Sequence, residues 1–225
     1  MDPDVARIVD ANANRAREAL RVLEEFARFS LNDRWLSSRI KSLRHALAQA
    51  LVDFGGGQLV RARNIASDVG RSIETEAEYM RGCVGDVAIA AAKRAAEALR
   101  VIEEYTKTTG SELSRRFETL RYELYEIERA VAIRTSARER FADVGLYVLI
   151  TESLCHGPWL ETAKSVIDGG ADCIQLREKR LSDGDLLERT RTLAKLCREA
   201  GILFIVNDRP DIAKLGGADG VHVGQ

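Results

Sequence analysis

The sequence predicts a protein of two parts, α followed by α/β: a helical part over residues 1–140 and a part with alternating strands and helices over residues 141–225. Before about residue 140, alanine, arginine, glutamate and leucine dominate and the only proline is Pro3, a composition typical of helix. After it, short apolar runs alternate with amphipathic stretches that end at glycines, which is typical of strand–helix repeats.

The composition limits the classes of function. Lys and Arg number 34 against 35 Asp and Glu, and a net charge of −1 gives no field that would recruit nucleic acid or an anionic membrane. No apolar run approaches the length of a membrane span, and the first residues lack the order of a signal peptide. The four cysteines form no Cys-x-x-Cys pair, which favours a reducing compartment over zinc or disulfides. We therefore expect a cytoplasmic protein with neither nucleic-acid nor membrane partners.

The helical part begins with an apolar stripe from Val5 to Ala27 that ends at the Asn32-Asp33 turn. A second helix is expected over residues 33–54, where three glycines at 55–57 stop it. A further long helix is expected from residue 111 to about 137. Asn12 and Asn14 lie in an alanine-rich run, where they indicate either a local binding role or a break or cap within the first helix.

A repeat organises this part. Residues 15–26 recur as residues 94–105 at a constant offset of 79 (94 − 15), and Leu43-Arg44 matches Leu120-Arg121 at an offset of 77. We expect a duplicated helical bundle, with two helical hairpins related by a pseudo-twofold axis. The Arg and Glu residues spaced three and four apart in each copy are expected mainly to form surface ion pairs.

A polar stretch over residues 58–70 separates the two copies, and a loop between hairpins is a natural place for a ligand site. Residues 75–78 then have the pattern of a capping box. The candidate site of the helical part comprises Asn12, Asn14, Arg61, Arg63 and Asp68.

The second part begins with a strand over residues 144–151. Pro158 then opens a helix that closes at 168–170, Ser182 begins a capped helix that ends at Gly201, and Pro210 opens a short helix that ends at Gly217. Strict alternation predicts a parallel sheet with right-handed crossovers. About four strands are present, whereas an eight-stranded (β/α) barrel needs at least ~200 residues, so we expect the first half of a barrel, apparently truncated.

Polar side chains follow the strands of this sheet. Gln175, Arg177 and Lys179 follow the second strand, and Asn207 and Asp208 follow the third. Because parallel strands end at the same edge, these groups should share one rim, where cations, amides and a carboxylate suit a phosphorylated substrate with a metal ion.

Two alternatives compete with this interpretation. Arg177 and Lys179 could pair with Glu178 or Glu152, and Asp208 could cap the helix that follows. His222, between two valines, fits a barrel-core residue as well as a ligand contact.

The motifs Gln175-Leu-Arg-Glu-Lys179 and Val206-Asn-Asp-Arg209, with residues 146–151 before them and 217–225 after them, resemble the first half of the thiamin phosphate synthase family, whose members are TIM barrels. The resemblance covers about residues 145–225. Residues 14–26 and their repeat are similar to a helical domain fused ahead of that synthase in some bacteria and linked to phosphorylation of hydroxymethylpyrimidine phosphate.

The resemblance implies an enzyme of thiamin biosynthesis, a transferase that joins hydroxymethylpyrimidine diphosphate to a thiazole phosphate and releases diphosphate. It implies that Asp208 holds Mg²⁺. The chemistry needs no side-chain nucleophile, and the motifs offer no obvious one. The charge of the departing diphosphate would be stabilised by cations and the metal. The residues implied to bind the pyrimidine diphosphate are Gln175, Leu176, Arg177, Glu178, Lys179 and Asn207.

In the family a second magnesium-binding aspartate follows the segment that ends here at Gln225. We therefore expect no synthase turnover from these 225 residues alone, and an unpaired fourth strand that favours a homodimer or aggregation. Two alternatives concern the helical part. It could be an ATP-dependent kinase for the pyrimidine phosphate, although residues 1–140 contain no Gly-x-x-x-x-Gly-Lys loop, or it could be a non-catalytic dimerisation module.

Overall fold

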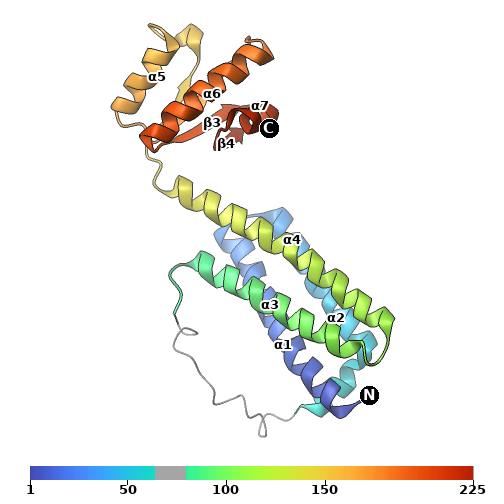
Figure 1. Ribbon diagram of the computed structural model, residues 1–225. Helices are drawn as coiled ribbons and strands as arrows, with labels where there is room; N and C mark the ends of the chain where they lie inside the picture. Colours follow the sequence, from blue (N-terminus) through green and yellow to red (C-terminus); the bar gives the residue numbers. More distant parts are fainter. Residues whose placement is uncertain (64–79, 225) are drawn as a thin grey trace. The chain divides into compact units, whose positions relative to one another are not determined.

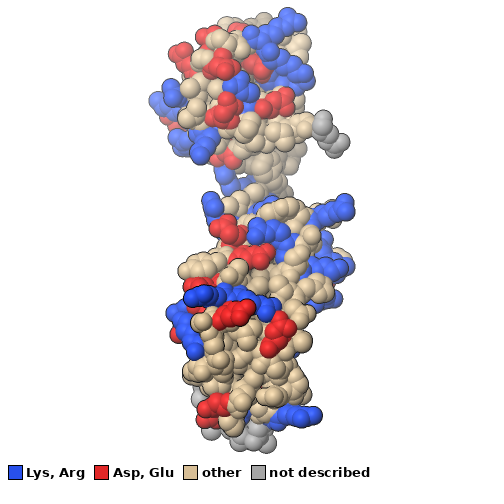
Figure 2. All heavy atoms as spheres, turned by 90° about the vertical axis from the view of Figure 1, so that its right-hand side faces the viewer, with Lys and Arg blue, Asp and Glu red and all other residues tan. Residues whose placement is uncertain are grey.

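The computed structural model describes residues 1–63 and 80–224, which divide into two compact units, Met1–Arg138 and Glu139–Gln225. Asp68, the expected capping box at 75–78 and Gln225 lie outside the described residues. Within the described ranges, no helix has both the length and the apolar character needed to cross a bilayer. Anionic and cationic side chains are interspersed on the visible face of each unit, in keeping with the balanced charge (Figure 2).

The first unit is helical, as predicted, and α1 and α3 pack along each other (Figure 1). Its first helix starts where the sequence supplies a cap: the Asp2 side chain accepts hydrogen bonds from the N–H groups of Asp4 and Val5, and Pro3 occupies the first turn. The elements of this unit are α1 (Pro3–Glu25), the π-helical turn η1 (Phe26–Ser30), α2 (Arg34–Ala62), α3 (Val84–Thr106) and α4 (Ser111–Ala142).

One alternative for these helices was wrong, and one expectation was met in part. Asn12 and Asn14 neither break nor cap α1, because the helix runs through both, and the buried Asn12 donates from Nδ2 to the Ile8 carbonyl at 2.9 Å. The glycines at 55–57 interrupt the second helix as expected, since Gly55 adopts a non-helical φ of 118°, but helical conformation resumes after this kink and α2 continues to Ala62. Leu59 in the resumed part is only 3% exposed and packs into the core.

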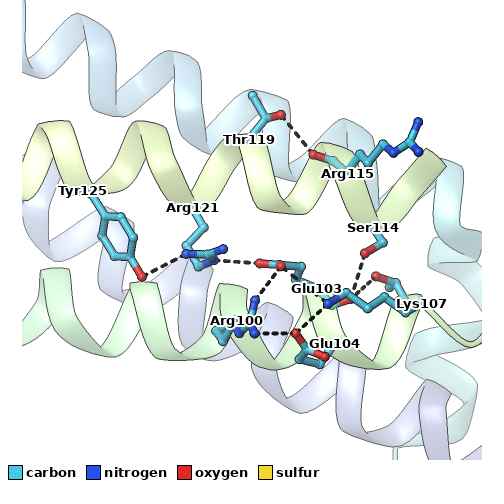
Figure 3. A network of polar contacts seen from close by, with 10 residues as sticks. Arg100, Glu103, Glu104, Lys107, Ser114, Arg115, Thr119, Arg121 and Tyr125 are labelled. Carbon is cyan, nitrogen blue, oxygen red and sulfur yellow. Dashed lines mark hydrogen bonds and ion pairs between the residues drawn. The ribbon is translucent and has the colours of Figure 1, made fainter. Parts of the chain in front are cut away.

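Two glutamates of this unit are buried and paired with an arginine from the following helix. Arg44 donates from Nε to Glu24 at 2.9 Å, and Arg121 donates from Nε to Glu103 at 2.7 Å. Figure 3 shows the second network, in which Arg100 also reaches Glu103. The expected surface pairs are present as well, but the sequence spacing alone did not distinguish these buried members from their exposed neighbours.

The second unit has a four-stranded sheet in the order β1-β2-β3-β4 with every neighbouring pair parallel, as predicted. Ser182 caps α6 through its side chain, and Gly201 and Gly217 adopt left-handed conformations after α6 and α7. The elements are β1 (Tyr147–Ile150), η4 (Glu152–Leu154), α5 (Trp159–Asp168), β2 (Cys173–Leu176), α6 (Asp183–Ala200), β3 (Leu203–Asn207), α7 (Pro210–Gly216) and β4 (Gly220–His222).

The two faces of this sheet have different partners. Alternate strand residues such as Ile174, Leu176 and Val206 pack with α5, α6 and α7, whereas Cys173 and Ile205 belong to a smaller cluster on the opposite face that includes no helix residue among those described. The unit is therefore a parallel sheet with its helices on one face, and the face without helices carries the polar groups of the strand ends.

Candidate functional site

Two buried amides lie at the carboxyl ends of β2 and β3. Gln175 is 2% exposed and Asn207 is 9% exposed, and Gln175 Nε2 donates to Asn207 Oδ1 at 2.8 Å. The hydroxyl of Tyr147 on β1 donates to Gln175 Oε1 at 2.7 Å. Burial raises the pKa of Tyr147 to about 12, so the phenol keeps its proton and remains a donor. Three adjacent strands thus fix the orientation of both amides.

Asp208 follows at the end of β3 with an exposed side chain and a left-handed backbone, φ 60°. Asn207 Nδ2 donates to its Oδ2 at 2.6 Å, and the Gly224 N–H donates to its Oδ1 at 3.4 Å. The alternative that Asp208 caps the next helix is wrong, because Arg209 is the N-cap of α7 and its side chain makes no capping bond. The carboxylate therefore stays at the rim, beside the amides.

His222 lies on the same side of the sheet. It pairs in register with Asn207, and its Nδ1 lies 3.4 Å from Gln175 Nε2. The side chain is thus on the face of the sheet without helices, with Gln175 and Asn207, and it is exposed in the described part of the chain. An exposed ring next to Gln175 is placed to contact a ligand on the rim.

The segment after β2 carries the two cations predicted for the site. The Arg177 N–H donates to the Ile150 carbonyl at 2.9 Å, and Thr151 Oγ1 donates to the Arg177 carbonyl at 2.8 Å, so the end of β1 holds this backbone. Within residues 1–63 and 80–224, neither Arg177 nor Lys179 forms an ion pair. The alternative in which Glu178 or Glu152 neutralises them is wrong, since both carboxylates pair with Arg189 instead.

Leu176 and Glu178 point away from this rim. Leu176 is 1% exposed and packs in the core between the sheet and its helices. Glu178 contacts Arg189 of α6 at 2.9 Å. The structure thus brings Gln175, Asn207 and Asp208 together, and it directs the side chains of the other two residues toward the helices.

The donor set at the rim fits magnesium bound together with a phosphorylated ligand. Among the described residues, no group of three or more His, Cys, Asp or Glu side chains could hold a metal by itself. Mg²⁺ usually binds through one or two carboxylates, several waters and substrate phosphates. One exposed carboxylate at Asp208, held by the Asn207 amide, matches that pattern.

In the helical unit, Asn12, Asn14 and Arg63 line one pocket of about 670 Å³. Arg63 is bound to Asp10 through two hydrogen bonds of 2.7 and 2.9 Å, and this contact raises the pKa of the guanidinium above its usual value. Arg61 is an exposed residue of α2 that does not line the pocket, and Asp68 lies outside the described residues.

A neighbouring groove of about 720 Å³ lies between α1 and α3. It shares Asn12 with the first pocket and is lined by the equivalent pairs Arg15 with Arg94 and Glu18 with Glu97, which stand 79 residues apart. The repeat was the sequence signal for these residues, but it gave no indication that both copies face one groove.

Neither Tyr147 nor Arg189 stands out in the sequence as a site residue. For Arg189 a signal existed: it lies three residues after Leu186 and four before Leu193, and both leucines are buried, so the arginine sits on the apolar side of its helix. A charged residue in that position needs a partner.

The fold and the rim define a class: a helical unit ahead of a parallel α/β unit whose strand ends carry amides, cations and a carboxylate. Residues 7–130 match the ThiD2 family, and residues 146–225 match the family described as Thiamine monophosphate synthase. The first match covers more than half of the chain, which therefore belongs to the ThiD2 family, and the second confirms the resemblance of the α/β part.

The chain is 41% identical over 225 residues to the thiamine-phosphate synthase of Rhodopirellula baltica, with 98% of this chain and 60% of that protein covered. It is 40% identical over 221 residues to that of Thermosynechococcus vestitus, with 97% and 61% covered. The chain thus spans about 60% of the length of these relatives. A solved thiamine phosphate pyrophosphorylase from Pyrococcus furiosus shares 36% identity over 38% of this chain and 40% of that chain, with a TM-score of 0.34.

Proposed function

We propose that the rim of the α/β unit binds the pyrimidine diphosphate substrate of thiamin phosphate synthesis as its magnesium complex. The observation that carries the proposal is the line of hydrogen bonds through Gln175, Asn207 and Asp208. The segment that follows β2 adds Arg177 and Lys179, which form no ion pair among the described residues. The names of the relatives, thiamine-phosphate synthase, support the same reaction for the longer proteins.

The chemistry required of these residues is binding and charge stabilisation. Arg177 and Lys179 offer positive charge to the diphosphate oxygens, on which negative charge grows as the bond to the pyrimidine breaks. The Tyr147 hydroxyl fixes the Gln175 amide, and Gln175 in turn fixes Asn207, so the polar groups do not reorganise when the ligand binds. The cation that develops on the pyrimidine accepts the thiazole nitrogen without a side-chain nucleophile.

Asp208 would hold the magnesium ion, which supplies further neutralisation of the diphosphate charge. The Asn207 side chain donates to one carboxylate oxygen of Asp208 and leaves lone pairs on both oxygens available. Asp208 is the only acidic residue that we assign to the ion.

The test is calorimetric titration of inorganic diphosphate into the chain, with and without MgCl₂. We expect binding that requires magnesium, and we expect Lys179→Ala to weaken it at least about tenfold, because a hydrogen bond to a charged group contributes roughly 1.5–3 kcal/mol. Asp208→Asn should remove most of the magnesium dependence. Lys195→Ala, an exposed change on α6, is the matched control. Absence of binding, or equal binding without magnesium, would refute the proposal.

For the fold, we propose that the helical unit is a duplicated bundle and that residues 1–140 and 141–225 form separate domains, the second being part of a (β/α)8 barrel. Two equivalent buried pairs support the duplication. Glu24 with Arg44 and Glu103 with Arg121 occupy matching positions at the offsets of 79 and 77 residues. The helices on one face of the parallel sheet support the barrel relationship.

We also propose a second ligand site in the groove between α1 and α3. The observation that favours it is that Arg15 and Arg94 line one groove and form no ion pair with any described residue. Two guanidiniums suit a phosphorylated ligand. Calorimetry with the pyrimidine phosphate and with ATP, on the wild type, Arg15→Gln and Arg94→Gln, tests it. Arg129→Gln, exposed on α4, is the control. If neither ligand binds to the wild type, the site is refuted.

A further inference from the structure

Glu178 lies between the two cations of the rim in the sequence, yet it does not neutralise them. Its Oε1 accepts a hydrogen bond from Arg189 at 2.9 Å and another from the Glu152 N–H at 2.7 Å. The Glu178 side chain is 8% exposed. The carboxylate is therefore held by groups on the helix side of the sheet.

Arg189 binds a second acidic residue at the same time. Its second terminal nitrogen donates to Glu152 Oε2 at 2.9 Å, while its guanidinium lies over the Trp159 ring, 4.5 Å from the centroid. The Arg189 side chain is 11% exposed. Stacking on the ring and two carboxylate contacts from different segments fix this guanidinium in one position.

The direction of β2 explains why the position of Glu178 matters for the rim. The backbone of β2 continues to Arg177, whose N–H is still bound to the Ile150 carbonyl, and side chains alternate along such a segment. Leu176 and Glu178 face the helices, so Arg177 follows Gln175 on the opposite face. The two sets of charges are separated only as long as Glu178 stays on the helix side.

We propose that Arg189 is a positioning residue that sequesters Glu178 and Glu152 and so keeps Arg177 and Lys179 available to a diphosphate ligand. Without Arg189, the released Glu178 carboxylate would have Arg177 and Lys179 as its direct neighbours in the chain. An ion pair formed there competes directly with the anionic ligand. The inference rests on the proposed function for its ligand, but the separation of charges is a property of the chain alone.

The experiment compares four proteins: wild type, Arg189→Gln, the double variant Arg189→Gln with Glu178→Gln, and Arg191→Gln. Arg191 is exposed on the same helix and serves as the matched control. Circular dichroism verifies that the helices are retained. The first readout is the Kd of inorganic diphosphate with MgCl₂. We expect Arg189→Gln to raise it about tenfold, the size of one charge interaction, and the double variant to return within about threefold of wild type.

The second readout needs no ligand. Acetylation of Lys179 by acetic anhydride, followed by mass spectrometry, reports how accessible and reactive its amine is. Pairing with a released carboxylate favours the protonated amine, so Lys179 should react more slowly in Arg189→Gln and regain the wild-type rate in the double variant. If Arg189 only stabilised the fold, the additional change Glu178→Gln would not restore the wild-type reaction rate.

The outcomes separate the two ideas. If the wild type does not bind magnesium diphosphate, the proposed function fails, and the acetylation rates still decide the role of Arg189. If Lys179 reacts at the same rate in Arg189→Gln as in the wild type, or if the double variant does not recover, the sequestering role is refuted even when diphosphate binds.

Discussion

Arg121 and Glu103 form an ion pair in which the two side chains are 8% and 2% exposed, with Arg121 Nε 2.7 Å from Glu103 Oε2. The hydrogen bond to Glu103 raises the pKa of Arg121 above its usual value, and the hydroxyl of Tyr125 accepts a further bond from the guanidinium at 3.1 Å. The pair joins α3 to α4 inside the helical unit, where an unpaired charge would have little access to water.

Arg121→Met should destabilise the helical unit by about 3–5 kcal/mol, because Glu103 would lose its buried partner. Guanidinium unfolding followed by Trp35 fluorescence in a Trp159→Phe background measures this unit alone, since each unit has one tryptophan. Arg44→Met removes the equivalent pair, but Arg44 is 28% exposed, so its loss should be smaller. Equal losses for the two variants would contradict the importance of burial.

Gly55→Ala should destabilise the same unit by roughly 1–2 kcal/mol, because a residue with a Cβ is strained in the left-handed half of the backbone map. Gly55 has φ 118°, and an added Cβ would meet only the flexible Met1 Cε at 3.0 Å, so the backbone decides the outcome. Gly57→Ala, helical and with open space around it, should be stabilising instead. Thermal unfolding of both variants is the measurement, and a shift of equal sign would show that the kink is not required.

Gly216→Ala should destabilise the α/β unit by about 1–3 kcal/mol through overpacking. An added Cβ would lie 2.3 Å from Thr190 Cγ2, at the contact of α7 with α6. Trp159 fluorescence in a Trp35→Phe background reports this unit. Thr190→Ser removes the clashing methyl and keeps the hydroxyl that bonds Leu186, so it should recover part of the loss. If Thr190→Ser does not restore stability, the loss in Gly216→Ala does not come from the contact with the Thr190 methyl.

Burial raises the pKa of Cys173 to about 11 and that of Cys197 to about 12, from a reference of 9.0. The native state keeps protons that the unfolded state releases, so stability should fall as the pH rises from about 9 toward 12. With Cys83 and Cys155 replaced by Ser, we expect both remaining thiols to resist Ellman's reagent at pH 8 until denaturant is added. Fast reaction without denaturant would show that the reagent reaches the two thiols in the native state.

Short sequence motifs were sufficient to predict much of the structure of the α/β unit. The cap at Ser182 and the left-handed glycine at Gly201 mark α6 in the sequence as they do in the structure. The proximity of Gln175, Asn207 and Asp208 followed from one rule, that parallel strands end at a common edge.

Contacts between distant segments were beyond the sequence. Arg189 of α6 pairs with Glu152, which follows β1, and with Glu178, which follows β2. The residues around Arg189 in the sequence do not indicate these partners. Glu24 and Glu25 have the same local pattern of charges, yet only Glu24 is buried, because the approach of α2 decides which face is covered. Likewise, the sequence did not indicate that helical conformation resumes after Gly55, where Leu59 is buried.

The left-handed backbone of Asp208 restricts which amino acids evolution can place there. Among residues with a side chain, asparagine and aspartate tolerate this conformation best, because their short polar groups bond locally. Glutamate would bring the same charge with a longer side chain and a greater backbone penalty. Saturation mutagenesis at this codon should therefore return aspartate for metal-dependent binding, with asparagine and glycine surviving only when folding alone is selected.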